Sequence, residues 1–536
     1  MKQKYKWSKP DKETTFFLVF LVCMAVYYGW RMFALTPWYD ELYTYYYFIS
    51  RGPVYAAIHW PLPNNHVGYS VLSAIFDWTG SSAVGLRGVS YLASLGCFIL
   101  LYWIGRRCFS EGIALLPPCL YASMNLVNQI AVQGRGYALA AFLYLAAFCI
   151  MWKITACGEK RFRFYVLFGI CLAWSLYTLP SSVYFVLPLC AAGGITLLCE
   201  KRLREFWKLV GVSLCSAVCT VGLYGIIWLA IGSNLLSKTE GSAYYGLGHV
   251  QIILHAPFAA AKTGIDYMLA TPYIQSVARQ GYLSRLGSYI HTLFDYYYNG
   301  LAYVLIGVAV VGVAAVVCRL ILHFKTNFVE WYLLISFLMT PLILIIQAAL
   351  PYYRVFSYFG AAMALMITWL VSQVSMEIHN KKTTVIAKRF SSLASVVAVL
   401  ILVTAIFLPS KNAPYSAREA AIEDGYRAAD VSQYEKIAVA DCDQEYLLKY
   451  LYGLDMDSDN NVRLTTVIED ADCVLLDRDL LLSEGDYVSR DSIGDMWKLY
   501  VTRDTLPVEY LEEKMRAVYE NDRFVLYVKK EKYYEK

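Results

Sequence analysis

Apolar runs of membrane-spanning length alternate with short polar segments over the first three quarters of the chain. Eleven runs come near the roughly 20 residues that a helix needs to cross a bilayer. They lie at approximately 14–36, 84–105, 111–129, 135–152, 164–179, 181–198, 208–231, 298–321, 328–349, 354–374 and 391–409. The pattern predicts a polytopic α-helical membrane protein with about 11 transmembrane helices.

The pattern changes after residue 409. Short strand-like runs ("KIAVA", "ADCVLL", "RFVLYVKK") then alternate with helix-like runs ("DQEYLLKYLYGL", "VEYLEEKMRAVYE"). This alternation predicts a small α/β domain over residues 410–536. The membrane domain then covers residues 1–409 and carries two outer loops, 37–83 and 232–297. The second loop is too long for a simple connection, so we expect helices at the membrane surface within it.

The composition excludes an ordinary soluble enzyme, because 58% of the residues are hydrophobic and 17% are charged. Basic clusters such as "GRR", "EKRFR", "EKRLREFWK" and "KKTTVIAKRF" all fall on one side of the predicted spans. Positive loops face the cytoplasm. We therefore expect a multi-pass protein of the cell membrane, with a cytoplasmic N-terminus and an extracytoplasmic C-terminal domain. We expect the lipid bilayer, and no nucleic acid, as a partner.

Nearly all of the 14 cysteines lie inside or beside apolar runs, where they act as small apolar residues. Cys442 and Cys473 lie in the polar tail. Either one disulfide or two buried thiols is compatible with an extracytoplasmic tail.

An adjacent pair of acids, Asp40 and Glu41, stands among aromatic residues in "PWYDELYTYY", just after the first apolar run. A carboxylate in such surroundings is costly unless it is paired or working. Adjacent helical residues point about 100° apart, so the two acids would have different partners. One interpretation is a pair of helix-start carboxylates beside the helix dipole. The other is a general base with a pKa raised by desolvation.

Further polar residues fall on the same predicted side as the acid pair. Because the guanidinium fork suits phosphate, the arginines among them are candidate phosphate ligands. Each residue also has a structural interpretation: turn chemistry for asparagine, a structural hydrogen bond for histidine, anchoring at lipid head groups for arginine, and an interfacial belt for the tyrosines at 43 and 45–47. The candidates are Asn64, Asn65 and His66 in "PNNH", Arg135 and Tyr137 in "RGYAL", Lys262 in the long outer loop, and Arg354 in "YYR". The long loop adds Asp266, Arg279, Arg285 and His291.

Taken in order, the acid pair, "PNNH", "RGYAL" and "YR" resemble the GT-C glycosyltransferases, in particular the bacterial protein O-mannosyltransferase and aminoarabinose transferase branch. The resemblance covers about residues 14–409. It implies an integral membrane hexosyl- or pentosyltransferase. Such an enzyme takes a sugar from a polyprenyl-phosphate donor and inverts the anomeric centre in one displacement.

Carried onto this chain, the resemblance implies a role for each matching residue. Asp40 would be the general base, and Glu41 would position the acceptor, the donor sugar or a cation. Arg135 and Arg354, with Lys262, would bind the lipid phosphate. The substrate-binding set would be completed by the residues of the first-loop polar segment and of "RGYAL", namely Asn64, Asn65, His66 and Tyr137.

The small α/β tail departs from the O-mannosyltransferases, and it leaves a cell-wall glycan, a lipid or a protein open as the acceptor. A second outer acid for a metal exists only at Asp77, Asp266 or Asp295. We therefore expect no metal site, with a divalent ion as the alternative. Two other functions stay open. One is a transporter or flippase of lipid-linked sugars, and the other is a binding subunit with an inactive membrane part. Transporters place ionisable residues near the midplane, whereas here the predicted spans are almost free of charge between their ends.

Overall fold

The structure is a computed structural model that describes residues 11–59, 65–238, 246–248, 250–251, 254, 256–270, 281–322, 327–381, 384–407, 416–454, 463–481 and 498–532. The chain divides into two compact units. Unit 1 comprises Met1–Phe33 and Arg51–Asn412, and unit 2 comprises Ala34–Ser50 and Ala413–Lys536. The sequence-based division placed residues 37–50 with the membrane part, but in the structure they pack with the C-terminal segment.

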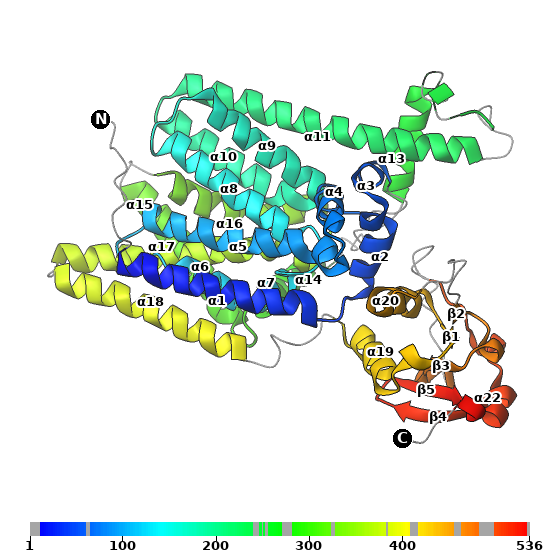
Figure 1. Cartoon of the computed structure of the whole chain (residues 1–536). Helices are drawn as coiled ribbons and strands as arrows, with labels where there is room; N and C mark the ends of the chain where they lie inside the picture. Colours follow the sequence, from blue (N-terminus) through cyan, green and yellow to red (C-terminus); the bar gives the residue numbers. More distant parts are fainter. Residues whose placement is uncertain are drawn as a thin grey trace. The chain divides into compact units, whose positions relative to one another are not determined.

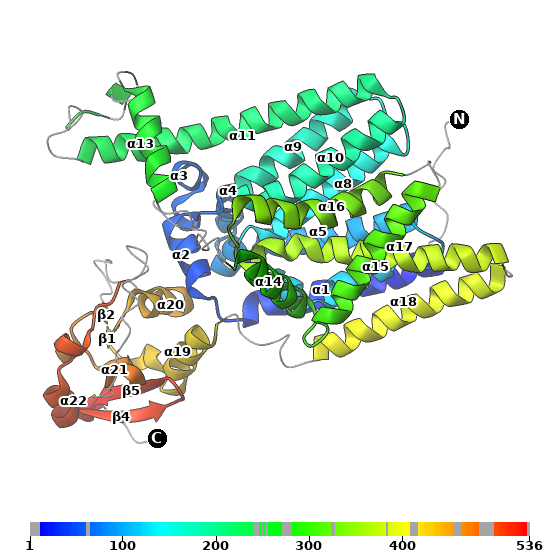
Figure 2. The ribbon, with the colours of Figure 1, turned by 180° about the vertical axis from the view of Figure 1, so that it is seen from behind.

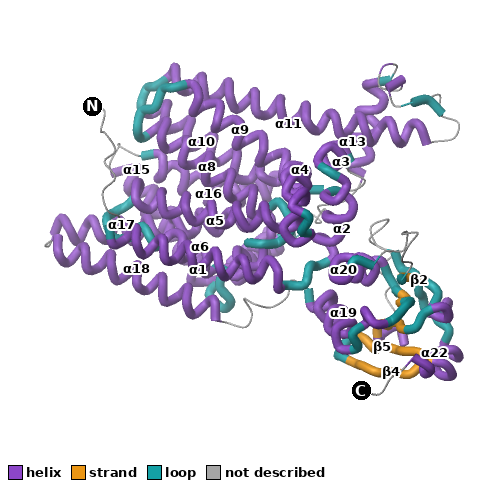
Figure 3. Tube along the Cα trace, in the orientation of Figure 1, coloured by secondary structure: helices purple, strands orange, loops and turns teal. Residues whose placement is uncertain are grey.

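Unit 1 is a bundle of helices, which are drawn in purple in Figure 3. Nine helices in the described ranges are long and apolar enough to cross a membrane. They include α1 (Lys12–Ala34), α5 (Ser82–Cys108), α8 (Tyr137–Thr155), α10 (Val183–Cys199), α11 (Leu203–Lys238), α15 (Ala302–Leu322), α16 (Phe328–Gln347), α17 (Ser357–Lys381) and α18 (Thr384–Phe407) (Figures 1 and 2). The apolar helix α9 (Phe162–Thr178) has 17 residues. The predicted polytopic helical fold is confirmed.

The predicted span at 111–129 is not one continuous helix. It is divided into α6 (Leu116–Ser123) and α7 (Asn125–Ile130). Met124 separates them with an extended backbone (φ −72°, ψ 135°). All eight residues of α6 and four of the six residues of α7 are buried. Hydropathy identifies this segment as apolar, but burial in the protein allows a broken helix that lipid would not tolerate.

One end of unit 1, here called the Arg106 end, carries ion pairs between neighbouring helices. Arg106 at the end of α5 pairs with Asp11 (2.7 Å) and Glu13 (2.8 Å) beside the start of α1. Arg202, before α11, donates a hydrogen bond to the carbonyl of Thr155 at the end of α8. Arg106 and Arg202 belong to two of the predicted basic clusters, "GRR" and "EKRLREFWK".

Short helices lie between the long ones in the predicted outer loops. They are α3 (Pro53–Ile58), α4 (Val67–Phe76), α13 (Pro257–Ala270) and α14 (Tyr282–Tyr297). Three tyrosines fasten α14 to the chain at 344–356: the hydroxyls of Tyr282, Tyr289 and Tyr297 donate to the carbonyls of Leu344, Pro351 and Phe356, each at 2.6 Å. The spacing of seven and eight residues places them on one helix face. This face holds the segment that precedes α17.

Unit 2 contains a five-stranded sheet of order β2-β1-β3-β5-β4. β1 pairs in parallel with β2 and β3, and β5 pairs antiparallel with β3 and β4. The strands are β1 (Ile437–Ala438), β2 (Leu464–Thr465), β3 (Cys473–Asp477), β4 (Met515–Glu520) and β5 (Phe524–Lys529); the helices are α2 (Tyr39–Tyr47), α19 (Ala417–Ala428), α20 (Cys442–Tyr452), α21 (Arg478–Leu481) and α22 (Val508–Lys514). The predicted small α/β fold is confirmed for the tail, but the run "VEYLEEKMRAVYE" is not one helix, because α22 ends at Lys514 and β4 begins at Met515.

The two tail cysteines are separate buried thiols. Cys442 begins α20 and Cys473 begins β3, and neither forms a disulfide. Burial raises the pKa of the Cys442 thiol to about 11 and raises that of Cys473 further. Of the two alternatives that the sequence left open, the structure has the pair of thiols.

Candidate functional site

A buried histidine and a buried arginine from distant segments meet at the end of unit 1 opposite the Arg106 end. His66 directly precedes α4, and Arg135 lies two residues before α8. The Nε2 of His66 is 3.2 Å from a guanidinium nitrogen of Arg135. The backbone N–H of Gly136 donates to Nδ1 of the same ring at 2.9 Å. Two of the predicted motifs, "PNNH" and "RGYAL", therefore form one site.

The surroundings keep the His66 ring neutral. A protonated ring would carry a hydrogen on both nitrogens, and it would then direct two donors at the Gly136 N–H and the Arg135 guanidinium. Burial and the positive charges of Arg135 and Arg354 hold the pKa of His66 well below its usual range. If Nδ1 accepts from Gly136, the hydrogen resides on Nε2. Nε2 and Arg135 are then two donors at the same place, which is an arrangement suited to an anion.

Tyr137 and Arg354 extend this pair. The Tyr137 ring meets the His66 ring edge to face, with centroids 5.0 Å apart. The Arg354 guanidinium carbon is 5.8 Å from the centroid of the Tyr137 ring and 4.9 Å from that of Tyr352. Contacts of this kind hold a cation over the negative face of a ring. We call His66, Arg135, Tyr137 and Arg354 the His66–Arg354 cluster.

Two glycines allow the segments around the cluster to approach closely. A Cβ atom on Gly136 would lie 2.6 Å from the methyl group of Thr178 and 3.2 Å from the Cβ of His66. A Cβ atom on Gly68 would lie 2.5 Å from the Thr178 hydroxyl oxygen. Thr178 is the last residue of α9. The glycine of "RGYAL" is thus explained by the contact between α4, α8 and the end of α9.

A narrow crevice adjoins the cluster, and three helices begin around it. Its walls come from the first turn of α8, from the 3₁₀ turn that leads into α10, and from the start of α17. They are formed by Tyr137, Ala140, Leu179, Ser181, Ser182, Phe185, Val355, Ser357 and Tyr358. The N-terminus of each helix carries a partial positive charge and exposed N–H groups. The crevice and the cluster together favour a negatively charged ligand.

The backbone around Arg135 is fixed by a serine that the sequence reasoning did not single out. The hydroxyl of Ser90 on α5 lies 2.6 Å from the carbonyl of Gln133 and 3.1 Å from that of Arg135. One turn earlier on α5, Arg87 donates to the carbonyl of Met32 near the end of α1 (3.0 Å). No periodicity marks Ser90 or Arg87, because each is one polar residue in an apolar helix.

Other predicted residues lie elsewhere or have structural roles. Asn65 is buried; its amide group donates to the carbonyls of Ala56 (2.9 Å) and His59 (3.0 Å), and its oxygen accepts from Ser70 (2.7 Å). These bonds use most of its capacity, so Asn65 closes the loop in front of α4. Lys262 is exposed on α13. Asn64 and Arg279 lie outside the described residues.

Asp40 and Glu41 are the second and third residues of α2, which belongs to unit 2. Glu41 is fully buried, and its carboxylate accepts the backbone N–H of Trp38 at 3.3 Å. This bond fits the helix-start interpretation of Glu41, and the part of Glu41 in a reaction stays a prediction. Asp40 is half-buried, and its backbone carbonyl accepts from the hydroxyl of Thr44 at 2.7 Å. Its role in catalysis stays a prediction.

The tyrosines that follow the acid pair do not form an interfacial belt. Tyr43 and Tyr45 are buried within unit 2. Tyr46 stacks on Tyr446 of α20, with centroids 5.5 Å apart, and Tyr45 meets Tyr450 edge to face at 6.2 Å. The belt interpretation was wrong because the partners of these rings lie some 400 positions later in the chain.

The acids that were considered for a metal site do not gather. Asp295 accepts the backbone N–H of Gly300 at 2.7 Å, and Asp266 is exposed on α13. In the portion of the chain that the structure describes, no three His, Cys, Asp or Glu side chains form a group that could hold a metal ion.

No protein-family model and no curated protein matches the chain. Among solved structures it is similar to the oligosaccharyltransferase AglB from Archaeoglobus fulgidus in complex with an inhibitory peptide and a dolichol-phosphate. The TM-score is 0.45 at 13% identity, over 82% of this chain and 64% of that one. A second structure of the A. fulgidus oligosaccharyltransferase, tethered with an acceptor peptide, gives a TM-score of 0.41 at 12% identity, over 77% and 58%.

The arabinosyltransferase EmbB from Mycobacterium smegmatis gives a TM-score of 0.39 at 12% identity, over 85% of this chain and 43% of that one. The chain thus spans less than two thirds of the length of each of these three structures. By name they are oligosaccharyltransferases and an arabinosyltransferase, and they do not single out the O-mannosyltransferase and aminoarabinose transferase branch.

Proposed function

We propose that this protein is an integral membrane glycosyltransferase that moves a sugar from a polyprenyl-phosphate donor to an acceptor outside the cytoplasm. The observation that carries the proposal is the His66–Arg354 cluster beside the crevice where α8, α10 and α17 begin. A polyprenyl tail needs an apolar bundle, and a phosphate needs cations and helix N-termini. One end of unit 1 offers both.

In the proposed reaction an acceptor hydroxyl attacks the anomeric carbon of the donor sugar. The new C–O bond forms as the bond between that carbon and the phosphate oxygen breaks, which inverts the centre. Asp40 takes the hydroxyl proton as general base. The polyprenyl phosphate leaves with the bonding electron pair, and Arg135 and Arg354 stabilise its charge. The neutral His66 adds one donor from Nε2.

A flippase of lipid-linked sugars is the alternative. It would bind the same phosphate but would leave the sugar–phosphate bond intact. The polar cluster lies at the ends of helices, whereas transporters place substrate sites near the midplane on broken helices. This position favours chemistry at one face of the membrane over alternating access.

The experiment that tests the proposal uses the full chain in lipid nanodiscs with a panel of polyprenyl-phosphate sugars and a membrane extract that supplies acceptors. Release of free polyprenyl phosphate is measured with and without EDTA. We expect release by wild type and a loss of at least about 1,000-fold in the Asp40→Asn variant. Asp295→Asn is the matched control, because Asp295 bonds only locally to Gly300 among the contacts described.

If no donor is cleaved, the transferase proposal fails and the flippase takes its place. If Asp40→Asn keeps full activity, the assignment of the base fails. Loss of polyprenyl-phosphate release in the presence of EDTA would show that the reaction needs a divalent ion.

A further inference from the structure

The helix that carries Asp40 is held by the C-terminal segment of the chain. We propose that Glu419 and Tyr446 are positioning residues, which fix the orientation of α2 and with it the Asp40 carboxylate. This inference rests on the proposed function for the role of Asp40, and it assigns the C-terminal domain a part in the transfer reaction. The contacts that support it all lie within unit 2.

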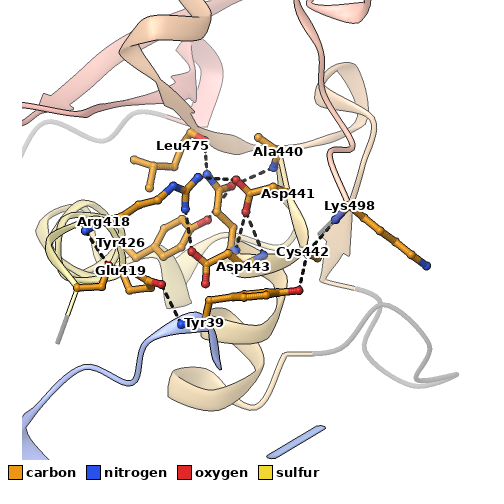
Figure 4. Close-up of polar contacts among 12 residues, drawn as sticks. Tyr39, Arg418, Glu419, Tyr426, Ala440, Asp441, Cys442, Asp443, Leu475 and Lys498 are labelled. Atoms are coloured by element: carbon orange, nitrogen blue, oxygen red, sulfur yellow. Dashed lines mark hydrogen bonds and ion pairs between the residues drawn. The ribbon is translucent and has the colours of Figure 1, made fainter. Parts of the chain in front are cut away.

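Glu419 provides the N-terminal cap of α2. The residue at the cap position is Trp38, whose side chain has no oxygen to accept a backbone N–H. Instead the Oε1 of Glu419 accepts the N–H of Tyr39, the first residue of the helix, at 2.8 Å (Figure 4). A carboxylate at this position satisfies one of the unpaired N–H groups and opposes the positive end of the helix dipole. The cap is one residue away from Asp40.

The Glu419 carboxylate is itself fixed. Its Oε2 accepts a hydrogen bond from the hydroxyl of Ser416. The neighbouring Arg418 is buried and pairs with Asp441 (2.6 Å) and Asp443 (2.7 Å) at the start of α20. Figure 4 shows the Arg418 side chain directed at Asp441 and Asp443. The Glu419 carboxylate that caps α2 is thus held in place by its neighbours, as a positioning role requires.

One face of α2 packs on α20. The rings of Tyr39 and Tyr46 stack on Tyr446, with centroids 6.4 Å and 5.5 Å apart. Leu42, between them on the same face, is fully buried in the core of unit 2. Positions 39, 42 and 46 follow the helical repeat, so they point in one direction. The hydroxyl of Tyr39 also lies 3.6 Å from the Cys442 sulfur.

Asp40 follows Tyr39 directly, so it is about 100° around the helix from the capped residue. A rotation of α2 or fraying of its first turn would displace the Asp40 carboxylate. A misplacement of about 1 Å in a catalytic group can lower a rate by about 100-fold. The cap and the stacked rings oppose both movements, which is the physical reason to expect an effect on turnover.

The test follows hydrogen exchange of the α2 amides by mass spectrometry and, in parallel, donor cleavage. It uses the purified full chain in nanodiscs with the polyprenyl-phosphate sugar that wild type cleaves. We expect Glu419→Ala to speed exchange at 39–47 at least about tenfold. We expect it to lower kcat at least about tenfold with the donor KM unchanged within twofold. Glu419→Gln keeps an acceptor oxygen, so we expect it to restore most of the protection at 39–47 and most of kcat. Glu509→Ala, an exposed glutamate on α22, is the matched control.

A second pair of variants guards against simple unfolding. Tyr446→Ala removes the ring on which α2 stacks, and Tyr446→Phe keeps it. We expect the alanine variant to behave like Glu419→Ala. The phenylalanine variant loses only the hydroxyl contact with Tyr47, and we expect it to keep most of the wild-type protection and turnover. Exchange in β3 and β5 reports on the sheet of unit 2. If the sheet also exchanges faster in Glu419→Ala, that variant has loosened unit 2 as a whole. The comparison between Tyr446→Ala and Tyr446→Phe then decides whether the contact with α2 affects turnover.

The inference is overturned if the α2 amides keep their protection from hydrogen exchange in both alanine variants. It is also overturned if both alanine variants keep the wild-type turnover. Its failure is distinguishable from failure of the proposed function. A wild-type protein that cleaves no donor refutes the transferase and, with it, the positioning role in transfer. A wild-type protein that cleaves donor normally, with an α2 insensitive to Glu419 and Tyr446, refutes only the positioning role.

Discussion

The backbone N–H of Gly136 donates to Nδ1 of His66 at 2.9 Å, and this bond joins the start of α8 to the start of α4. The two residues are 70 positions apart in the chain. The bond decides the state of the ring, because an Nδ1 that accepts cannot carry a proton. It links a local feature of the backbone to the charge of the candidate phosphate site.

We predict that His66 makes the protein less stable in mild acid. Its pKa is held low in the folded state, whereas in the unfolded chain it is near 6.5. Below about pH 6.5 the unfolded chain therefore binds a proton that the folded protein does not. Stability falls as the pH falls, by up to about 1.4 kcal/mol per pH unit. Thermal unfolding of detergent-solubilised wild type and His66→Gln between pH 7.5 and 5 measures the difference.

The His66→Gln variant should lose less stability over this pH range than wild type. Parallel loss in wild type and His66→Gln would show that other groups cause the pH dependence.

We predict that Gly136→Ala destabilises unit 1 by roughly 1–3 kcal/mol, as overpacking does in other cores. The new Cβ would lie 2.6 Å from the Thr178 methyl group. Gly225→Ala on α11 meets no atom within 4 Å and should be neutral or slightly stabilising. Thermal unfolding of each variant measures the effect.

Thr178→Ser removes the methyl group that the new Cβ meets, so the double variant Gly136→Ala with Thr178→Ser should recover part of the loss. Absence of any recovery would place the strain at the His66 Cβ instead.

We predict that Arg354→Gln lowers kcat/KM for a polyprenyl-phosphate sugar by about 10- to 100-fold. This is the range expected when one charged hydrogen bond, of about 1.5–3 kcal/mol, is lost. Arg285→Gln, which removes an exposed arginine on α14, should change kcat/KM less than twofold. Steady-state release of polyprenyl phosphate is the measurement. Equal effects of the two substitutions would indicate a general loss of surface charge rather than a phosphate contact.

We predict that Arg418→Met destabilises unit 2 by about 3–5 kcal/mol, because Asp441 and Asp443 would keep buried negative charges after losing this cation. Hydrogen exchange of β3 and α20 in the full chain should accelerate. Arg516→Met on β4, where the residue is exposed, is the control. Unchanged exchange in Arg418→Met would mean that the buried acids find other partners.

The long helices could be predicted from sequence because apolar length alone decides whether a segment can cross a bilayer. The break at Met124 could not, since both halves of the segment are apolar and only packing distinguishes a broken helix from a continuous one. The sequence predicted that "PNNH" and "RGYAL" lie on the same side of the membrane. The contact between His66 and Arg135 was not, because it depends on how closely Gly68 and Gly136 approach Thr178.

The environment of α2 is where the structure differs most from the prediction made from the sequence. Its tyrosines follow an apolar span, and that local context favours a membrane belt. Their partners Tyr446 and Tyr450 are on α20, and no local pattern links segments so far apart. Asn65 was a ligand candidate by residue type, and only its three hydrogen bonds identify it as a loop residue.

The contact between Tyr39 and Glu419 spans 380 positions of the chain, and this separation sets an order of events during biosynthesis. At 5–20 residues per second, a ribosome needs about 20–80 s after it has made α2 to reach the residue that caps it. Through this interval the segment 34–50 has been synthesised but lacks its partner. An interrupted chain that ends before α19 would already contain the long apolar helices described above, but its α2 would be unsupported. On the proposed function, such a product would reach the membrane inactive, because the helix that carries Asp40 would lack its cap.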